Sequence, residues 1–300
     1  MILQPKNLKD LQEQLRNTDK PVKSIDLAAI ARLKDHKPED MTATVEAGMM
    51  LSDLQKILAQ RGQWLPIDPP NPHKLTIADL VSRNLNGPRR FGFGLIRDWL
   101  IGIRFVLADG RLIFNGGNVV KNVAGFDLCK LLIGSRDSIG IVVETIFKLA
   151  PLPERESFQK TECESLESAD ESINIILGSE LRPSVIDLHR SHGTNPILTT
   201  GFSGTATDVG AQVEALKKLS NVTEQNLEYD ALLRKEAIHT HSNSSSTLID
   251  LIKENNTTPY VARAGNGVLY SPAAALPRIP SSLEQRIKEI FDPKGILPPL

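Results

Sequence analysis

The feature that most restricts the fold is a long β-branched run that ends at closely spaced prolines. Residues 140–150, GIVVETIFKLA, predict one buried strand, and Pro151 and Pro153 end it. Before this stop, short strand and helix patterns alternate around glycine turns. After it, longer helical patterns separate the strands. We therefore expect two units, each mixing helices and strands, with the main boundary near residue 152.

The first sixty residues predict a small α/β unit. Residues 22–27 and 41–48 alternate like strands and are separated by a charged loop at 34–40. Ser52 is the expected cap of the helix that follows. The order strand, helix, strand, helix favours parallel pairing.

Turn residues organise the stretch between residues 60 and 150. Four prolines between 66 and 72 prevent regular structure there, and Thr76 is the expected N-cap of a new helix. Asp109-Gly110 lies between two apolar runs, which predicts a β-hairpin. A short helix is expected over residues 126–135.

The second half predicts an α+β domain of the ferredoxin-like kind. Residues 165–179 and 205–220 have helical patterns, and strand candidates lie at 184–190 and 196–204. The serine-rich stretch 239–247 is expected to be a polar loop. A final capped helix is expected from residue 281.

Composition excludes several classes of function. The 300 residues carry a formal net charge of −1, with 40% hydrophobic and 24% charged residues, so no overall basic bias indicates nucleic acid or anionic lipid. No apolar run reaches the length of a membrane span, and the amphipathic start does not resemble a signal peptide. Cys129 and Cys163 lack any motif, so we expect reduced thiols in a cytoplasmic protein.

A first candidate anion-binding stretch is GGNVVKNVAGFD at 116–127. Gly116, Gly117 and Gly125 allow backbone N–H groups to converge, and Lys121, followed by Asn122, adds a positive charge. Hairpins also need glycine, and by itself the pattern favours a plain hairpin.

A second candidate is the segment 76–94. A helix that begins at Thr76 offers unsatisfied N–H groups and a positive dipole end to a phosphate. Arg89 and Arg90 lie among Gly87, Gly92 and Gly94. A solvated basic loop explains this pattern equally well or slightly better.

The third candidate, GSRDSIG at 134–140, places two glycines and two serines around a turn into a buried strand. A simple helix–strand connection is the commoner explanation. Metal binding has little support, since His239, His241, His189 and His192 lack a third neighbouring ligand. Neither a nucleophile elbow nor the dinucleotide GxGxxG pattern is present.

Taken in order, three stretches resemble a known family. VEAGMMLSDLQKILAQRGQWLPIDPP, TIADLVSRNLNGPRRFGFGLIRDWLIGI and GGNVVKNVAGFDLCKLLIGSRDSIGIVVETIFKLAP are similar to the p-cresol methylhydroxylase-type (PCMH-type) FAD-binding domain of the vanillyl-alcohol oxidase superfamily. Within it, the VKNVAGFD stretch and the ending ARAGNGVLY…IKEIFDPKGIL most resemble the FAD-binding accessory subunits of bacterial glycolate oxidases.

The resemblance implies an α+β, two-subdomain PCMH-type FAD-binding fold with a ferredoxin-like α+β cap. It implies an FAD domain at 1–152, a cap at 153–262 and a C-terminal segment at 263–300 that returns to the FAD domain. It also implies a set of residues around non-covalent FAD: Pro70, Thr76, Ile77, Ala78, Asp79, Ser82, Gly87, Arg97, Asp98, Lys121, Asn122, Gly134, Ser135, Ser138, Gly140, Ile141 and Val143.

The same resemblance implies partners. A homologous catalytic flavoprotein subunit would oxidise a small 2-hydroxy acid, and an iron–sulfur subunit would complete the assembly. The complex would be cytoplasmic or peripheral to the inner face of the membrane. No catalytic base can be named in this chain, which suits an accessory role. Any flavin here would accept a hydride, with Lys121 stabilising the reduced ring.

Two departures from the family pattern leave a second function open. The family has a glycine-rich phosphate loop of the kind RGGGTK, whereas residues 20–41 here contain no glycine. The family's TIGG is replaced by Thr76-Ile77-Ala78-Asp79. A carboxylate about 5 Å from a phosphate would cost roughly 3 kcal/mol at an effective dielectric near 20. The alternative is therefore a flavin-free structural subunit that docks a catalytic flavoprotein.

Overall fold

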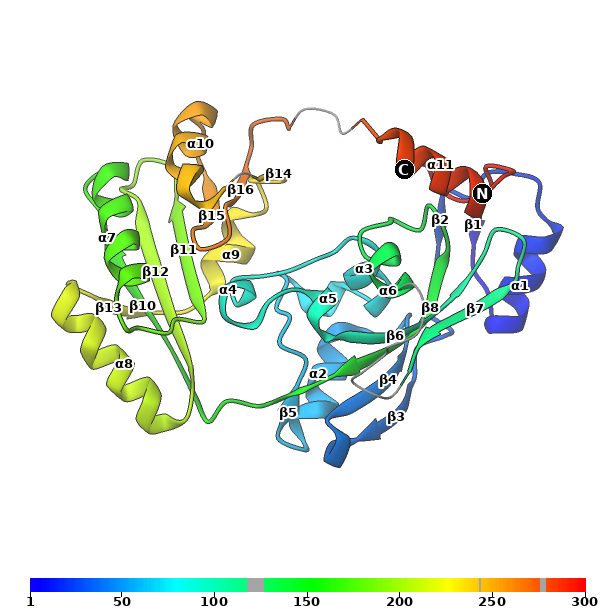
Figure 1. The fold of residues 1–300 in the computed structure, drawn as a ribbon, viewed down its shortest axis with the longest axis horizontal. Helices are drawn as coiled ribbons and strands as arrows, with labels where there is room; N and C mark the ends of the chain where they lie inside the picture. Colours follow the sequence, from blue (N-terminus) through cyan, green and yellow to red (C-terminus); the bar gives the residue numbers. More distant parts are fainter. Residues whose placement is uncertain (118–126, 243, 276–278) are drawn as a thin grey trace.

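The computed structural model describes residues 1–117, 127–242, 244–275 and 279–300. Two units lie side by side (Figure 1), each built on its own sheet. Both chain termini lie in the first unit, beside helix α11 (Ser282–Phe291). The predicted α+β class is thus confirmed.

The first unit is built on a five-stranded sheet in which every neighbouring pair is antiparallel. Its strands, in spatial order, are β3 (Leu33–Lys37), β4 (Thr42–Glu46), β8 (Ile141–Lys148), β6 (Leu100–Val106) and β7 (Leu112–Gly116). The hairpin at Asp109-Gly110 is confirmed as the β6–β7 pair. Seven of the eight residues of β8 are buried, as expected for a central strand.

Two predictions for this region were wrong. The sheet is antiparallel rather than parallel, because the expected charged loop at 34–40 contains strand β3, which pairs with β4. As an edge strand, β3 tolerates charged side chains. Ser52 is not the cap of helix α2 (Leu51–Ala59): the helix begins two residues earlier than expected, after the extended residue Met50, which bridges to Thr76.

A smaller layer packs beside this sheet at the chain's start. Strand β1 (Ile2–Leu3) pairs in parallel with β2 (Ser24–Ile25), and helix α1 (Leu8–Asn17) connects them. Asn7 caps α1 by accepting a hydrogen bond from the Asp10 N–H. Strands β5 (Gln63–Trp64) and β9 (Ala150–Pro151) form a second short pair.

Short helices connect the strands of the first unit. They are α3 (Ile77–Ser82), α4 (Arg90–Phe93), α5 (Ile96–Trp99) and α6 (Leu128–Leu132). Helix α6 confirms the short helix expected there. Helix α4 lies on the side of the first unit that faces the second, and it contacts strand β11 of the second unit (Figure 1).

The second unit begins with the β-α-β-β-α-β order of the ferredoxin-like fold. These elements are β10 (Arg155–Glu162), α7 (Leu166–Gly178), β11 (Val185–Arg190), β12 (Ile197–Gly204), α8 (Ala206–Leu219) and β13 (Thr223–Gln225). The strand order β13-β10-β12-β11 is continued by three further strands to make seven. The expectation of a ferredoxin-like cap is confirmed.

The three added strands come from the later sequence. They are β15 (Tyr260–Arg263), β16 (Val268–Ser271) and β14 (His239–Ser242), joined by helices α9 (Glu228–Leu233) and α10 (Leu248–Asn255). The predicted polar loop at 239–247 was therefore wrong in its first half. Pairing with β16 at the sheet edge overrides the polar composition of β14.

The expected start of the C-terminal segment, residue 263, falls at the end of β15, and β16 also belongs to the second sheet. The return to the first core is made by α11, through Ile287 and Phe291, and by the buried Ile296 and Leu297. We propose a division in which residues 155–271 form the second unit.

The two faces of the second sheet differ. One face forms an apolar core with α7, α8 and α10. The other carries α9 and faces the first unit, and it buries Asp187, His189 and Arg263 next to a small apolar cluster. Side chains alternate between faces along a strand, so these polar residues interleave with apolar ones such as Leu188.

Candidate functional site

A cavity of about 280 Å³ lies where the resemblance predicts the diphosphate of FAD. It is lined by residues 25–27 after β2, by the start of α3, and by Ser82, Asp137 and Ile141. Thr76, Ala78 and Asp79 therefore border the same cavity as Asp137 and Ile141. What lines this cavity decides which ligands fit it.

The N–H groups at the start of α3 are already bonded within the protein. Ile77 N–H donates to Met49 O at 2.9 Å, and Ala78 N–H donates to Ala47 O at 2.7 Å. Asp79 N–H donates to Thr76 Oγ1 at 3.1 Å. The expectation that Thr76 opens a helix with unsatisfied donors was wrong in this respect, because the β4–α2 turn supplies the acceptors.

Asp79 closes a capping box with Thr76. Its Oδ2 accepts hydrogen bonds from Thr76 N–H at 3.0 Å and from Thr76 Oγ1 at 2.8 Å. Its Oδ1 lies 3.7 Å from Arg83 Nη1. A carboxylate thus occupies the positive end of α3, where an anionic ligand would otherwise lie.

Two further carboxyl groups border the same cavity. Asp26 accepts a hydrogen bond from Ala28 N–H at 3.0 Å. Burial, and secondarily the charge of Asp79, raise the pKa of Asp137 to about 6. The turn that carries Asp137 rests on α3, because Gly134 N–H and Arg136 N–H donate to Val81 O and Ser82 O. The cavity is therefore acidic.

The remaining predicted residues lie in other surroundings. Gly134, Ser135 and Ser138 border a separate cavity of about 390 Å³ beside α11, and Pro70 borders the space between the units. Ile77 and Val143 are buried in the apolar core, and so is Ile141, which also borders the cavity at α3. Gly140 packs against Phe105, and Gly87 against the Asp68 backbone. Asp98 accepts a hydrogen bond from Leu95 N–H, and Arg97 lies beside it on α5. Lys121 and Asn122 lie outside the described residues.

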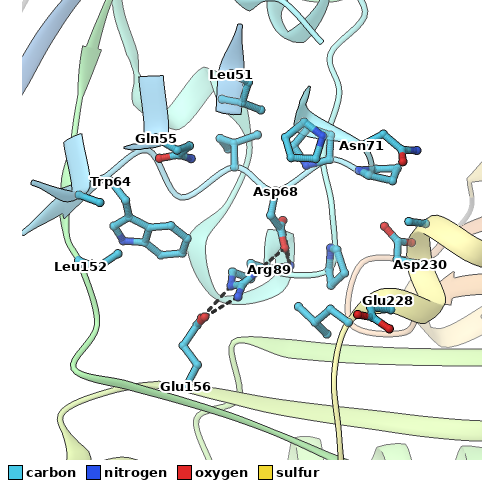
Figure 2. A pocket seen from close by; sticks show the side chains of 18 residues that line it. Leu51, Gln55, Trp64, Asp68, Asn71, Arg89, Leu152, Glu156, Glu228 and Asp230 are labelled. Carbon is cyan, nitrogen blue, oxygen red and sulfur yellow. Dashed lines mark hydrogen bonds and ion pairs between the residues drawn. The ribbon is translucent and has the colours of Figure 1, made fainter. Parts of the chain in front are cut away.

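Arg89, for which a solvated loop was the favoured explanation, is instead buried between the units (Figure 2). Its Nη1 lies 2.8 Å from Asp68 Oδ2. Its Nε and Nη2 bind the two oxygens of Glu156 on β10, at 2.7 and 2.5 Å. Arg90 is half-buried, and burial lowers its pKa. Asp68 has a pKa raised to about 6 by its burial.

A second buried ionic network lies under α9. Arg263 binds Asp187 through Nη1 and Asp230 through Nη2, and Tyr229 donates a hydrogen bond to Asp187 at 2.6 Å. Burial raises the pKa of Asp187 to about 6. Burial and the charge of Arg263 lower the pKa of His189 to about 3, so that imidazole is neutral. Sequence reasoning missed both networks, because the partners are 67 and 76 residues apart.

Other features are simpler. Within residues 1–117, 127–242, 244–275 and 279–300, no group of three or more His, Cys, Asp or Glu side chains is placed to hold a metal ion. In the same ranges, no helix has both the length and the apolar character needed to cross a membrane. Cys129 and Cys163 are buried free thiols, and burial raises the pKa of Cys129 to about 12.

Comparisons with known proteins agree with this fold. Residues 6–114 match the family described as FAD binding domain. The whole chain superimposes on alkyldihydroxyacetonephosphate synthase with a TM-score of 0.71 and 16% identity, covering 98% of this chain and 76% of that one. Residues 6–114 are thus similar to FAD-binding domains, and the chain has the fold of alkyldihydroxyacetonephosphate synthase.

The particular relatives are homologous glycolate oxidase subunits and D-lactate dehydrogenases. Glycolate oxidase subunit GlcD of Bacillus subtilis is 34% identical over 149 residues, which is 50% of this chain and 32% of that protein. Glycolate oxidase subunit GlcE of Escherichia coli is 33% identical over 131 residues, 43% and 37% of the two chains. The chain thus matches about a third of the length of these curated relatives.

The described residues of the 280 Å³ cavity do not fit the diphosphate of FAD. Asp26, Asp79 and Asp137 would repel its charge, and the α3 amides that could bind it are engaged. The family's glycine-rich loop is also missing from residues 20–41. The fold of an FAD-binding domain is present, while this part of its usual anion site is altered.

Proposed function

We propose that this chain is an accessory subunit of a flavin-dependent 2-hydroxy-acid dehydrogenase assembly related to glycolate oxidase. Its FAD-binding fold serves to dock a homologous catalytic flavoprotein, which supplies the flavin. An iron–sulfur subunit completes the assembly, which is cytoplasmic or held at the inner face of the membrane by its partners. The substrate, a small 2-hydroxy acid, is oxidised on the partner.

The relatives support the assembly. Two of them are named as subunits of glycolate oxidase, and one is a D-2-hydroxyglutarate dehydrogenase, 33% identical over 119 residues. Their names share one substrate class, the 2-hydroxy acids. Since a third of those proteins is matched, the activity of the whole relative is inferred for the assembly rather than for this chain.

The carboxylates of Asp79 and Asp137, which line the 280 Å³ cavity, support a subunit that binds no flavin. Asp79 accepts the hydrogen bonds of Thr76, and the pKa of Asp137 is raised by burial and, secondarily, by the charge of Asp79. A diphosphate placed there would meet both groups. This arrangement is the observation that carries the proposal.

A second candidate is an FAD-loaded subunit. The match of residues 6–114 to the FAD binding domain family favours it. In that case the cofactor would extend past the residues predicted from the resemblance, with Lys121 and Asn122 near the ring, and it would need a diphosphate position away from Asp79.

Flavin content and partner binding are separate measurements. The chain is expressed alone and purified, its flavin absorption is recorded, and FAD is titrated while protein fluorescence is followed. The proposal predicts a colourless protein that does not bind FAD stoichiometrically. A yellow protein that releases FAD on acid denaturation would establish the second candidate instead.

Partner binding is tested in the native host with an affinity tag on this chain. We expect a larger flavoprotein that oxidises a 2-hydroxy acid to co-purify in a fixed ratio. Recovery of the tagged chain alone under mild conditions, from cells that contain that flavoprotein, would contradict the docking role.

A further inference from the structure

A cavity of about 550 Å³ lies between the two units (Figure 2), and it has no lining residue in common with the acidic cavity at α3. The first unit contributes α2, the proline-rich segment 66–72 and the loop at 88–89. The second contributes the start of β10 and the first turn of α9. Its size is within the range of about 300–1,000 Å³ typical of small-molecule sites.

Most of the wall is apolar and held rigidly. Leu51, Trp64 and Ile67 are buried side chains of the first core or its edge, and Pro69 and Pro72 restrict the backbone beside them. The Trp64 ring packs edge-on against Phe93. Such a wall accepts an apolar body of moderate size without rearrangement.

The polar side chains on the wall are mainly carboxylates. Asp68, Glu156, Glu228 and Asp230 line the cavity, against one cation, Arg89, among the lining residues. The Arg89 guanidinium is paired with Asp68 and Glu156, to which its Nε, Nη1 and Nη2 donate close hydrogen bonds. The charge of Glu228 and Asp230 is therefore not balanced by Arg89.

Asp230 differs from the other three. It is 3% exposed, and its Oδ1 accepts a hydrogen bond from Arg263 Nη2 at 2.6 Å. Its Oδ2 is buried and accepts no hydrogen bond from any residue that the structure describes. Arg234 Nη1, at 3.9 Å, is beyond hydrogen-bonding distance. A buried carboxylate oxygen without a donor is costly, and a ligand that donates a hydrogen bond would relieve this cost.

Behind Asp230, the buried carboxylates are paired with arginines. Arg263 binds both Asp187 and Asp230, and Arg234 lies 3.9 Å from Asp230 Oδ2, so two arginines share two carboxylates there. Figure 2 shows the Asp230 side chain at the cavity wall, on the same side as Asn71 and across from Trp64. Because the lining residues hold four carboxylates and one arginine, a positively charged donor matches this wall better than a neutral one.

We propose that this cavity binds an organic cation, an ammonium or amidinium group carried on an apolar body, with the cationic group next to Asp230. The apolar body lies against Trp64 and the prolines. The site does not depend on the proposed function, since none of its argument uses the acidic cavity at α3 or a partner subunit.

The test uses benzylammonium as the probe and benzyl alcohol as its neutral analogue, each titrated into the full chain and followed by ligand-observed NMR. We expect benzylammonium to bind and the alcohol to bind about tenfold or more weakly, since a charged hydrogen bond is lost. No saturable binding of benzylammonium, or equal binding of the two probes, would overturn the proposal.

Two variants locate the site. Asp230→Asn should weaken benzylammonium binding about tenfold or more, whereas Glu224→Gln, at an exposed position that does not line the cavity, should change it little. Because Asp230 also pairs with Arg263, Ala59→Trp provides a variant outside that network: Ala59 is exposed on α2 and lines the cavity. Binding that survives the added indole unchanged would place the probe elsewhere and overturn the assignment.

Discussion

Asp79 and Thr76 hold each other at the start of α3: the carboxylate accepts hydrogen bonds from both the N–H and the hydroxyl of Thr76, at 3.0 and 2.8 Å. The Asp79 N–H returns a hydrogen bond to Thr76 Oγ1. One residue thus caps the helix and places a negative charge where related domains have glycine. Its role in stability can be measured directly.

Replacing Asp79 with Ala should lower the free energy of unfolding by about 1 kcal/mol, because the capping box is lost. Urea denaturation of the purified chain measures this change. Asp53→Ala is the control, since Asp53 makes an exposed pair with Lys56 and such pairs contribute little. Equal effects of the two substitutions would show that the capping box does not stabilise α3.

Replacing Arg89 with Met should destabilise the chain by about 3–5 kcal/mol, because Asp68 and Glu156 would be left without their cation. Urea denaturation measures the loss. Arg111→Met, which removes an exposed pair with Asp109, should cost less than about 1 kcal/mol. If Arg89→Met does not fold, Arg89→Lys should fold with reduced stability. Wild-type stability of either Arg89 variant would contradict a structural role for this arginine.

Asp137 should give a pH-dependent effect. Its folded-state pKa of about 6 lies above the ordinary value of 3.8, so the folded chain binds a proton between pH 6 and 4 that the unfolded chain does not. The penalty of its charge is therefore complete above pH 6 and disappears below about pH 4. Asp137→Asn should stabilise the chain by about 1–3 kcal/mol at pH 7.5.

This gain should shrink as the pH falls through 6, because the wild-type carboxyl then becomes neutral too. Denaturation at several pH values follows it. Asparagine tolerates the positive φ of 62° at this position, so backbone strain does not confound the comparison. A gain that is constant from pH 7.5 to 4 would show that the burial of the charge is not its cause.

Gly265 should not accept a side chain. A Cβ there would lie 2.1 Å from the Phe91 ring, which reaches across from α4. Gly265→Ala must displace that ring and should cost about 1–3 kcal/mol. Gly204→Ala is the matched control, because a Cβ at Gly204 meets nothing within 4 Å. Thermal unfolding of both variants tests whether Phe91 is held tightly; an unchanged midpoint for Gly265→Ala would contradict it.

Local sequence patterns predicted much of the fold. The β6–β7 hairpin, the central strand β8 and helices α7 and α8 of the second unit followed from periodicity and turn residues, whereas α9 and α10 were not predicted. Strands β3 and β14 did not, because both lie at sheet edges and are polar. Their structure depends on pairing with β4 and β16, which no local pattern encodes.

The candidate site was likewise predicted only in part. The resemblance named Thr76 and Asp79, which border one cavity, but not Asp137, which also borders it. It did not indicate that the α3 amides are bonded to Ala47 and Met49, because those acceptors come from a turn about thirty residues earlier in the sequence. Nor did the pair Arg89-Arg90 reveal which arginine is buried, since Glu156 lies in the other unit.

The ion pairs of Arg89 with Asp68 and Glu156 restrict movement of the two units relative to each other. Any swing of the second unit away from the first must separate a bidentate ion pair and draw Phe91 off Gly265. Both events expose charged or aromatic groups that are otherwise sheltered. The two halves are thus expected to tumble in solution as one particle, with rotational diffusion set by the whole chain rather than by either half.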